Sequence, residues 1–166
     1  MFTGLIALLC GAVASPLTTV PALDLSRYAG AWYEIARFDN RFERGCAGVT
    51  ALYTLRDDGR VDVLNRCHKG GVDGPEREAH GLARLPDARF PGRLEVSFFR
   101  PFWGDYQVIA LDPDYQWAVV GSPDRAFLWV LARDAMVRED TYAPGLQAAS
   151  AQGFDLSRLQ RTPQGR

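Results

Sequence analysis

Eight short segments rich in strand-forming residues constrain the fold of this chain more than any other feature. Apolar and polar residues alternate over approximately 32–38, 49–55, 61–67, 78–85, 93–99, 105–111, 116–121 and 127–133. Turn-forming clusters such as Asp57-Asp58-Gly59 and Asp112-Pro113 separate these segments. Strands at this spacing, with no helical segment between them, predict an all-β domain built as a sandwich or an up-and-down barrel.

The rest of the chain adds little regular structure. Residues 23–29 have room for one short turn before the first strand. The acidic pair Glu139-Asp140, followed by an alanine-rich run that ends at Gly153, predicts one helix. Residues 155–159 then predict a short edge strand. A chain of 166 residues suffices for one domain. We therefore expect an eight-stranded antiparallel up-and-down β-barrel with one C-terminal α-helix packed outside.

An up-and-down order assigns every connection to one of the two ends of the barrel. If the first strand rises from Gly30, the turn at Asp112 and Tyr115 and the end of the last strand at Arg133 share the lower end with Trp32. We expect Trp32 to plug this end, with the Arg133 guanidinium across its ring as a cation–π contact. Gly30 lets the chain approach closely there. These five residues are expected to be structural and to do no chemistry.

The same residues carry a resemblance to a known family. Gly30-x-Trp32, Asp112-x-x-Tyr115 and a final strand ending in Arg133 form the three-part pattern of the lipocalins. The stretches 30–45 and 97–112 are more specifically similar to bacterial outer-membrane lipocalins, and the resemblance covers residues 23–159. It implies a cofactor-free binding protein, not an enzyme, which stores or transports fatty acids or lysophospholipids for cell-envelope membrane maintenance. It also implies a lipid anchor at the N-terminus.

Residues 1–22 are expected to be an export segment and linker, followed by a lipocalin domain at 23–166. The first charged residue is Asp24, and the apolar run 5–13 is too short to span a bilayer but suits a signal peptide. Cleavage after Ala14 and acylation of Cys10 are both left open, since Leu9 stands where a lipoprotein signal has a small residue. Both alternatives place the protein on the periplasmic side of the outer membrane, lipid-anchored or soluble in the periplasm.

The two remaining cysteines, Cys46 and Cys67, are expected to form a disulfide. An exported chain permits one, and the hairpin that turns near Asp58 brings both residues to the same level on neighbouring strands. The main alternative from another class, a lipocalin-type isomerase, needs a free thiol inside the barrel. The expected position of both cysteines near strand ends at the top argues against it.

Strand alternation assigns an apolar lining to the interior. Three faces are expected to point inward, and they comprise Phe127, Trp129 and Leu131, then Leu94, Val96 and Phe98, then Tyr106, Val108 and Ala110. Glu34 and Ala36 of the first strand complete the candidate ligand contacts. The sequence leaves open whether Glu34 contacts a ligand or is a paired structural carboxylate.

The loops at the open end carry both charged and aromatic candidates. Arg44 and Arg100 can hold a carboxylate or phosphate head group, while Phe102 and Trp103 frame the entrance. The alternative is that these charges are only solvated, because acidic residues such as Asp39 lie nearby. A homodimer through these loops or through a sheet edge is compatible with the sequence.

Other chemistry has little support. The chain has no Gly-x-Ser-x-Gly elbow, no phosphate-binding Gly-Lys-Ser/Thr loop and no His/Cys cluster at metal-ligand spacing, so neither catalytic nor metal-binding residues are assigned. The net charge of −1 gives no reason to expect a nucleic-acid partner. His68 and His80 keep a haem or tetrapyrrole carrier as an alternative, although histidines at a surface or rim are the commoner case.

Overall fold

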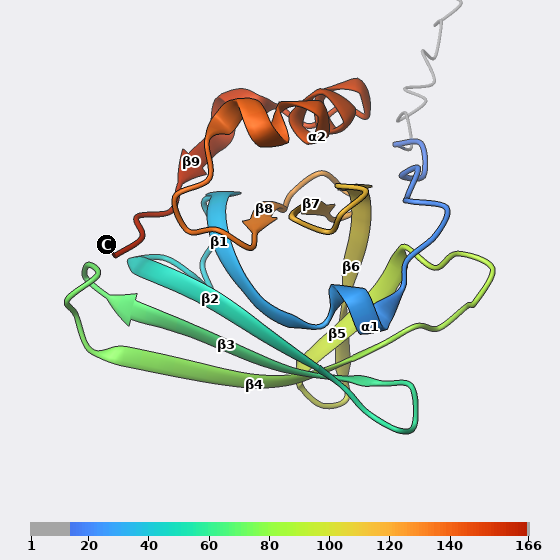
Figure 1. Cartoon of the computed structure of the whole chain (residues 1–166), viewed down its shortest axis with the longest axis horizontal. Helices are drawn as coiled ribbons and strands as arrows, with labels where there is room; N and C mark the ends of the chain where they lie inside the picture. Colours follow the sequence, from blue (N-terminus) through green and yellow to red (C-terminus); the bar gives the residue numbers. More distant parts are fainter. Residues whose placement is uncertain (1–13, 166) are drawn as a thin grey trace, which may run out of the picture.

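The computed structural model describes residues 14–165 and consists mainly of one antiparallel sheet that closes on itself. Strands β1 to β8 follow one another in chain order, and pairing between β1 and β2 closes the ring (Figure 1). Their bounds are Gly30–Phe38, Cys46–Leu55, Val61–Lys69, Glu76–Arg84, Arg93–Phe99, Phe102–Leu111, Trp117–Gly121 and Leu128–Ala132. The predicted eight-stranded up-and-down barrel is confirmed. Cys10 lies outside the described residues.

The elements outside the ring are α1 (Leu25–Tyr28), α2 (Glu139–Ala151), the single 3-10 turn η1 (Leu156–Arg158) and β9 (Leu159–Arg161). Helix α2 packs on the outside of β6 and β7, as predicted (Figure 1). It approaches closely because Gly145 faces β7, where an added Cβ would lie 2.6 Å from the Trp117 ring.

The predicted edge strand at 155–159 is displaced toward the C-terminus. The Asp155 carboxylate accepts a hydrogen bond from the Ser157 backbone N–H at 3.1 Å and so holds this segment as a turn. The strand that follows, β9, pairs with the upper half of β1 outside the ring.

Two β-bulges change which side chains face the interior. The register with β8 shifts between Glu34 and Ala36, and the register between β6 and β7 shifts between Val108 and Ala110. Each extra residue reverses the alternation beyond it. Ala36 and Ala110, both predicted to point inward, therefore pack in the apolar cluster beneath α2.

The barrel wall separates two apolar cores. Along β7, Ala118 and Val120 face the interior cluster, whereas Trp117 and Val119 face the cluster between the barrel and α2. All four side chains are buried because both faces of this strand are covered. β7 therefore lies between the two cores and contributes side chains to both.

The C-terminal tail fills a gap in the ring. β1 and β2 pair only from Gly30 to Tyr33, and above this point the two strands separate. The Thr162 N–H donates to the Ile35 carbonyl at 2.9 Å, and the Pro163 carbonyl accepts from the Gly48 N–H at 2.7 Å. The tail thus supplies hydrogen bonds that the two strands no longer give each other.

Candidate functional site

The lower end of the barrel is closed by a tryptophan and an arginine. Trp32 is fully buried, and the Arg133 guanidinium carbon lies 3.8 Å from the centroid of its ring. The Trp32 indole N–H donates to the Tyr28 carbonyl at 2.8 Å. Arg133 donates to the carbonyls of Ala29 and Ala31 at 2.9 and 2.8 Å. Because Arg133 ties the chain around α1 to the start of β1, its role here is structural.

The turn between β6 and β7 joins this closed end. The Asp112 carboxylate accepts from the backbone N–H groups of Asp114 and Gln116, each at 3.1 Å. The Tyr115 hydroxyl accepts from the Asp24 N–H at 2.9 Å, which fastens the turn to the start of α1. Gly30 adopts a φ of +95°, and an added Cβ there would lie 3.3 Å from Arg133 Nη1. The structure brings all five predicted closed-end residues to the same end.

Three tyrosines form the floor of the interior. The hydroxyl of Tyr106 lies 2.8 Å from that of Tyr28 and 3.0 Å from that of Tyr53. Burial raises the pKa of Tyr53 to about 12, so the phenol is neutral at physiological pH. A cavity of about 20 Å³, room for about one water molecule, remains beside them. The sequence predicted Tyr106 as a lining residue but missed its two partners.

A buried polar cluster lies higher in the barrel. Glu34 is 3% exposed, and its carboxyl accepts hydrogen bonds from Arg37 Nη1 and Thr162 Oγ1, both at 2.5 Å. Burial and the neighbouring Glu43 carboxylate raise the pKa of Glu34 to about 8. Glu34 is therefore both a paired structural residue and a polar group next to the interior.

Glu43 reaches this cluster from the β1–β2 loop. Its carboxylate accepts from the Asn40 amide at 2.5 Å and from the Trp129 indole N–H at 2.9 Å. Burial opposes its ionisation, but hydrogen bonds from Glu34, Trp129 and Asn40 outweigh burial and hold the pKa of Glu43 below its ordinary value. At neutral pH the Glu34–Glu43 pair therefore retains one proton. Nothing in the loop sequence distinguished Glu43 from a solvated acid.

Aromatic residues continue from this cluster to the open end. The Phe127 and Trp129 rings stack at 5.6 Å with an interplanar angle of 7°. Phe42 of the β1–β2 loop lies 6.4 Å from Phe127. On the other side of the barrel, Phe98 covers Gly81, where an added Cβ would lie 2.8 Å from the Phe98 ring. Val108, fully buried, belongs to the apolar wall below them.

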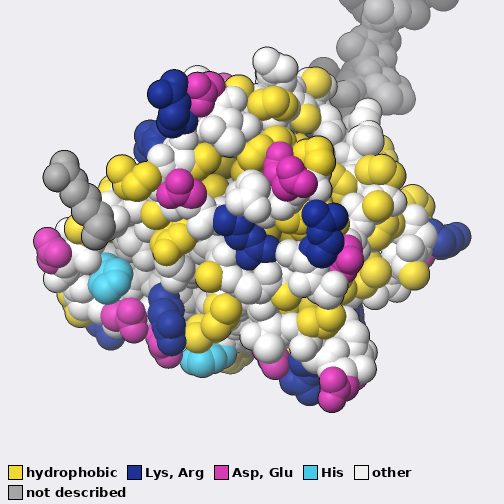
Figure 2. All heavy atoms as spheres, in the orientation of Figure 1, with side chains coloured by type: hydrophobic (Ala, Val, Ile, Leu, Met, Phe, Trp, Pro, Cys, Tyr) yellow, Lys and Arg dark blue, Asp and Glu magenta, His cyan; other side chains and the backbone are white. Residues whose placement is uncertain are grey.

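The remaining predicted contacts lie outside this interior. Trp103 packs on the outward face, with the Arg84 guanidinium carbon 3.9 Å from its ring centroid. Phe102 and Arg100 are exposed in the β5–β6 turn, and Arg44 is exposed and 3.4 Å from Asp39. On the face shown in Figure 2, basic and acidic side chains are likewise interspersed.

The predicted disulfide between Cys46 and Cys67 is present, with 5.4 Å between the Cα atoms. Both sulfurs are consumed in this bond, so neither is a free nucleophile in the cavity. His68 Nδ1 lies 2.9 Å from the Gly74 carbonyl, and His80 is exposed on the outer surface. Within residues 14–165 there is no cluster of three potential metal ligands and no helix long and apolar enough to cross a membrane.

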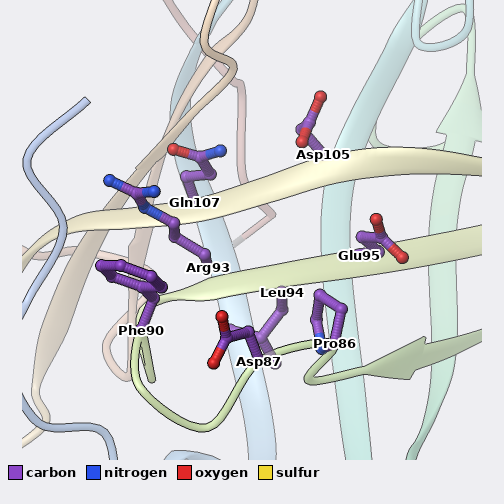
Figure 3. A pocket seen from close by; sticks show the side chains of 8 residues that line it. All are labelled: Pro86, Asp87, Phe90, Arg93, Leu94, Glu95, Asp105 and Gln107. Atoms are coloured by element: carbon purple, nitrogen blue, oxygen red, sulfur yellow. The ribbon is translucent and has the colours of Figure 1, made fainter. Parts of the chain in front are cut away.

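A second pocket, of about 270 Å³, lies by the β4–β5 loop and the adjoining strands β5 and β6 (Figure 3). Its wall includes the carboxylates of Asp87, Glu95 and Asp105. Arg93 in the same wall lies 4.4 Å above Phe90 and donates to the backbone carbonyl of residue 17 at 3.1 Å. This pocket carries several charged side chains, and its arginine fastens the N-terminal segment, so we do not include it in the ligand site.

Comparison with known proteins places this geometry in a family. A family model for a lipocalin-like domain matches residues 23–164. The outer membrane lipoprotein Blc of Escherichia coli (strain K12) is 45% identical over 143 residues, which are 86% of this chain and 80% of that protein. Temperature-induced lipocalin-1 of Arabidopsis thaliana is 38% identical over 157 residues, which are 89% of this chain and 83% of that protein.

Solved structures agree on the fold. Insecticyanin from the tobacco hornworm Manduca sexta has a TM-score of 0.73 at 22% identity, covering 92% of this chain and 87% of that one. The outer-membrane localisation predicted from the N-terminal segment is compatible with relatives that are outer membrane lipoproteins. With its closed barrel, its plugged lower end and a family match over nearly the whole barrel domain, the chain belongs to the lipocalin family.

Proposed function

We propose that this protein binds small amphiphilic lipids, such as fatty acids and lysophospholipids, in its barrel and stores or transports them without chemical change. The observation that carries this proposal is the division of the interior into an apolar wall and a buried polar cluster above it. Val108 and Leu131 belong to the apolar wall, and Glu34 and Glu43 to the polar cluster. The tail of an amphiphile matches the apolar wall, and its head group would lie beyond the polar cluster, toward the open end.

The acyl tail is expected to contact the inward-facing apolar side chains. Trp129, Phe127, Phe98, Tyr106 and Val108 are the sequence-predicted contacts that face this space. Each methylene buried against them contributes about 0.8 kcal/mol. The tyrosine floor limits how deeply a tail can reach, because its three hydroxyl groups already pair with one another.

The head group is expected to stay at the open end. We propose that Arg44 and Arg100 hold a carboxylate or phosphate there, because both guanidinium groups are exposed and the ion pair of Arg44 with Asp39 is long at 3.4 Å and open to solvent. Equal affinity for a lysophospholipid and its uncharged monoacylglycerol counterpart, unchanged by Arg44→Ala and Arg100→Ala, would remove this part of the proposal.

We further propose an exported protein that serves membrane maintenance on the periplasmic side of the outer membrane. The relatives named outer membrane lipoprotein support this location. A carrier is favoured over an isomerase because Cys46 and Cys67 are joined in a disulfide and so supply no free thiol to the cavity. The exposed position of His80 gives no support to a haem ligand.

Titration with a lysophospholipid, followed by tryptophan fluorescence, tests the lipid site. Trp129→Ala is expected to weaken binding by about tenfold, because one large aromatic wall of the interior is lost. Trp103→Ala is the matched control, since the same side chain lies there on the outer face, and binding should stay within a factor of about two. If neither lysophospholipid nor fatty acid binds at micromolar concentration, the carrier proposal is wrong. Mass spectrometry of lipid extracted from the purified protein would identify the natural ligand.

A further inference from the structure

The β5–β6 turn presents apolar side chains to solvent at the open end of the barrel. Phe99 is 76% exposed and Phe102 is 71% exposed, and the two residues pair directly across the turn. Arg100 and Pro101 lie between them. Large apolar side chains grouped at a projecting turn expose hydrocarbon to water without any gain in packing, which indicates an interaction surface.

A second exposed aromatic lies at the same end. The β1–β2 loop carries Phe42, which is 67% exposed. Antiparallel order places this loop and the β5–β6 turn at the end opposite the plug formed by Trp32. Arg41 lies beside Phe42, with its guanidinium carbon 4.8 Å from the ring centroid. Both loops therefore combine an exposed phenylalanine with an arginine.

The two loops carry three arginines, Arg41, Arg44 and Arg100, against the two acids Asp39 and Glu43. Arg41 and Arg100 form no ion pair with any residue in the range 14–165. Lys69 donates to the Arg44 carbonyl and so adds a further positive charge beside the β1–β2 loop. Glu43, an acid of this loop, turns inward and is bound to Trp129. Asp39, paired with Arg44, offsets only part of the positive charge.

We propose that this rim surface, formed by Phe42, Phe99 and Phe102 with Arg41 and Arg100, docks on an anionic phospholipid bilayer. The phenylalanines would enter the boundary between head groups and acyl chains, and the arginines would lie against the phosphates. A second copy of the chain fits less well. Two copies docked rim to rim would bring the same arginines against each other, and like charges in contact oppose association.

Docking in this orientation turns the mouth of the barrel toward the bilayer. A lipid leaving the membrane would then enter the interior without first exposing its tail to water. The inference goes beyond the proposed lipid binding, and either could hold without the other. A rim that docks on membranes needs no lipid in the barrel, and a barrel that binds lipid needs no docking rim.

Hydrogen–deuterium exchange of the full chain, with and without vesicles, tests the rim directly. The vesicles contain phosphatidylglycerol with phosphatidylethanolamine, and vesicles of phosphatidylcholine serve as the uncharged comparison. We expect slower exchange at residues 40–45 and 98–103 with the anionic vesicles, and a smaller effect with the uncharged ones. This readout is local, so an anchor at the N-terminus would not mimic it.

Two variants and one control make the test specific. Phe99→Ser, and independently Phe42→Ser in the other loop, should weaken vesicle affinity by about tenfold, as expected for the loss of one inserted phenylalanine. Met136→Ser is the matched control, because Met136 is also 67% exposed but lies beyond β8, outside the rim surface. Phe99 is outside the proposed lipid contacts, so Phe99→Ser should bind lysophospholipid as the unmodified protein does.

Three results would overturn the proposal. The first is unchanged exchange at the rim in anionic vesicles. The second is vesicle affinity that survives both phenylalanine substitutions. The third is the same protection in concentrated protein without vesicles, which would assign the rim to a second copy. Failure of the lipid titration with rim protection intact would instead remove the proposed function and leave the docking surface standing.

Discussion

Replacing Glu34 with glutamine should remove a pH dependence of stability that the buried carboxyl pair creates. In the folded protein the pKa of Glu34 is raised to about 8 from 4.5, through burial and the nearby Glu43 carboxylate. Between these two pH values the folded protein holds a proton at Glu34 that the unfolded chain has released. The free energy of unfolding therefore falls as the pH rises from about 4.5 to 8 and beyond.

The size of this effect follows from the pKa. At about 1.4 kcal/mol per pH unit, a rise from 4.5 to about 8 corresponds to about 5 kcal/mol as an upper limit. The β1–β2 loop carries Glu43, and we expect a shift of this loop toward solvent to relieve part of the repulsion. We therefore expect a loss of about 2–3 kcal/mol between pH 5 and pH 9.

Glutamine is the informative substitution because it has the shape of a protonated glutamate. Its carbonyl oxygen can still accept from Arg37 and Thr162, and its amide can donate to Glu43. Glu34→Gln should match the unmodified protein at pH 5 and exceed it in stability at pH 9. Glu95→Gln, at a half-exposed ion pair with Arg84 away from this cluster, is the control and should leave the pH profile unchanged.

Urea denaturation at a series of pH values measures both profiles. A stability difference between Glu34→Gln and the unmodified protein that stays constant from pH 5 to pH 9 would refute the reasoning. It would show that Glu34 is ionised throughout this range and that its ion pair with Arg37 dominates over burial.

Two further predictions concern the closed end and the disulfide. Trp32→Ala should lower the free energy of unfolding by about 3–5 kcal/mol, as for a large buried aromatic. Arg133→Ala should lower it by less and leave ligand selectivity unchanged. Thermal and urea unfolding measure both changes, and an Arg133→Ala protein that is stable but no longer binds ligand would contradict the structural role. Reduction of the Cys46–Cys67 disulfide should cost about 3 kcal/mol of unfolding free energy, and two reactive thiols from these positions in the denatured, unreduced protein would show that the bond does not form in solution.

The closed end was predictable from the sequence because its residues lie where the alternation of strands is regular. Trp32, Asp112 and Arg133 are far apart in the chain, but an up-and-down order determines the end at which each lies. Their chemistry is also specific, since an indole and a guanidinium pair in few other ways. The family pattern singled out these residues, and strand order showed that they meet at one end.

The lining was less predictable because the two bulges carry no local signal. Neither Glu34-Ile35-Ala36 nor Val108-Ile109-Ala110 contains a glycine or proline that would mark a break in the strand. Period-2 alternation consequently placed Ala36 and Ala110 inside, whereas the bulges turn them toward α2. The helix α2 accounts for the extra apolar residues, because the wall beneath it must be apolar on both faces.

The sequence pointed to Glu34 as a candidate buried carboxylate, but local pattern could not predict its partners, because the polar cluster assembles from four segments of the chain. Glu34 comes from β1, Glu43 from the β1–β2 loop, Trp129 from β8 and Thr162 from the tail. The separation of β1 from β2 explains why they meet. It opens a gap that the tail enters, and Gln164 bridges the two strands by donating to the carbonyls of Glu34 and Val49 at 2.8 and 3.0 Å.

This arrangement links the β1–β2 loop, at the open end of the barrel, to the protonation of the Glu34–Glu43 pair. Glu43 accepts a hydrogen bond from Trp129 and so links the β1–β2 loop to β8, and its carboxylate also shares a hydrogen bond with Glu34. When Glu34 loses its proton at high pH, two adjacent buried carboxylates repel each other. The β1–β2 loop is the element that can relieve this repulsion, since the tail and strand β9 hold β1 in place. The same loop carries Phe42 and Arg41 of the rim surface. We therefore expect a change in the protonation of Glu34 to affect the position of these two residues.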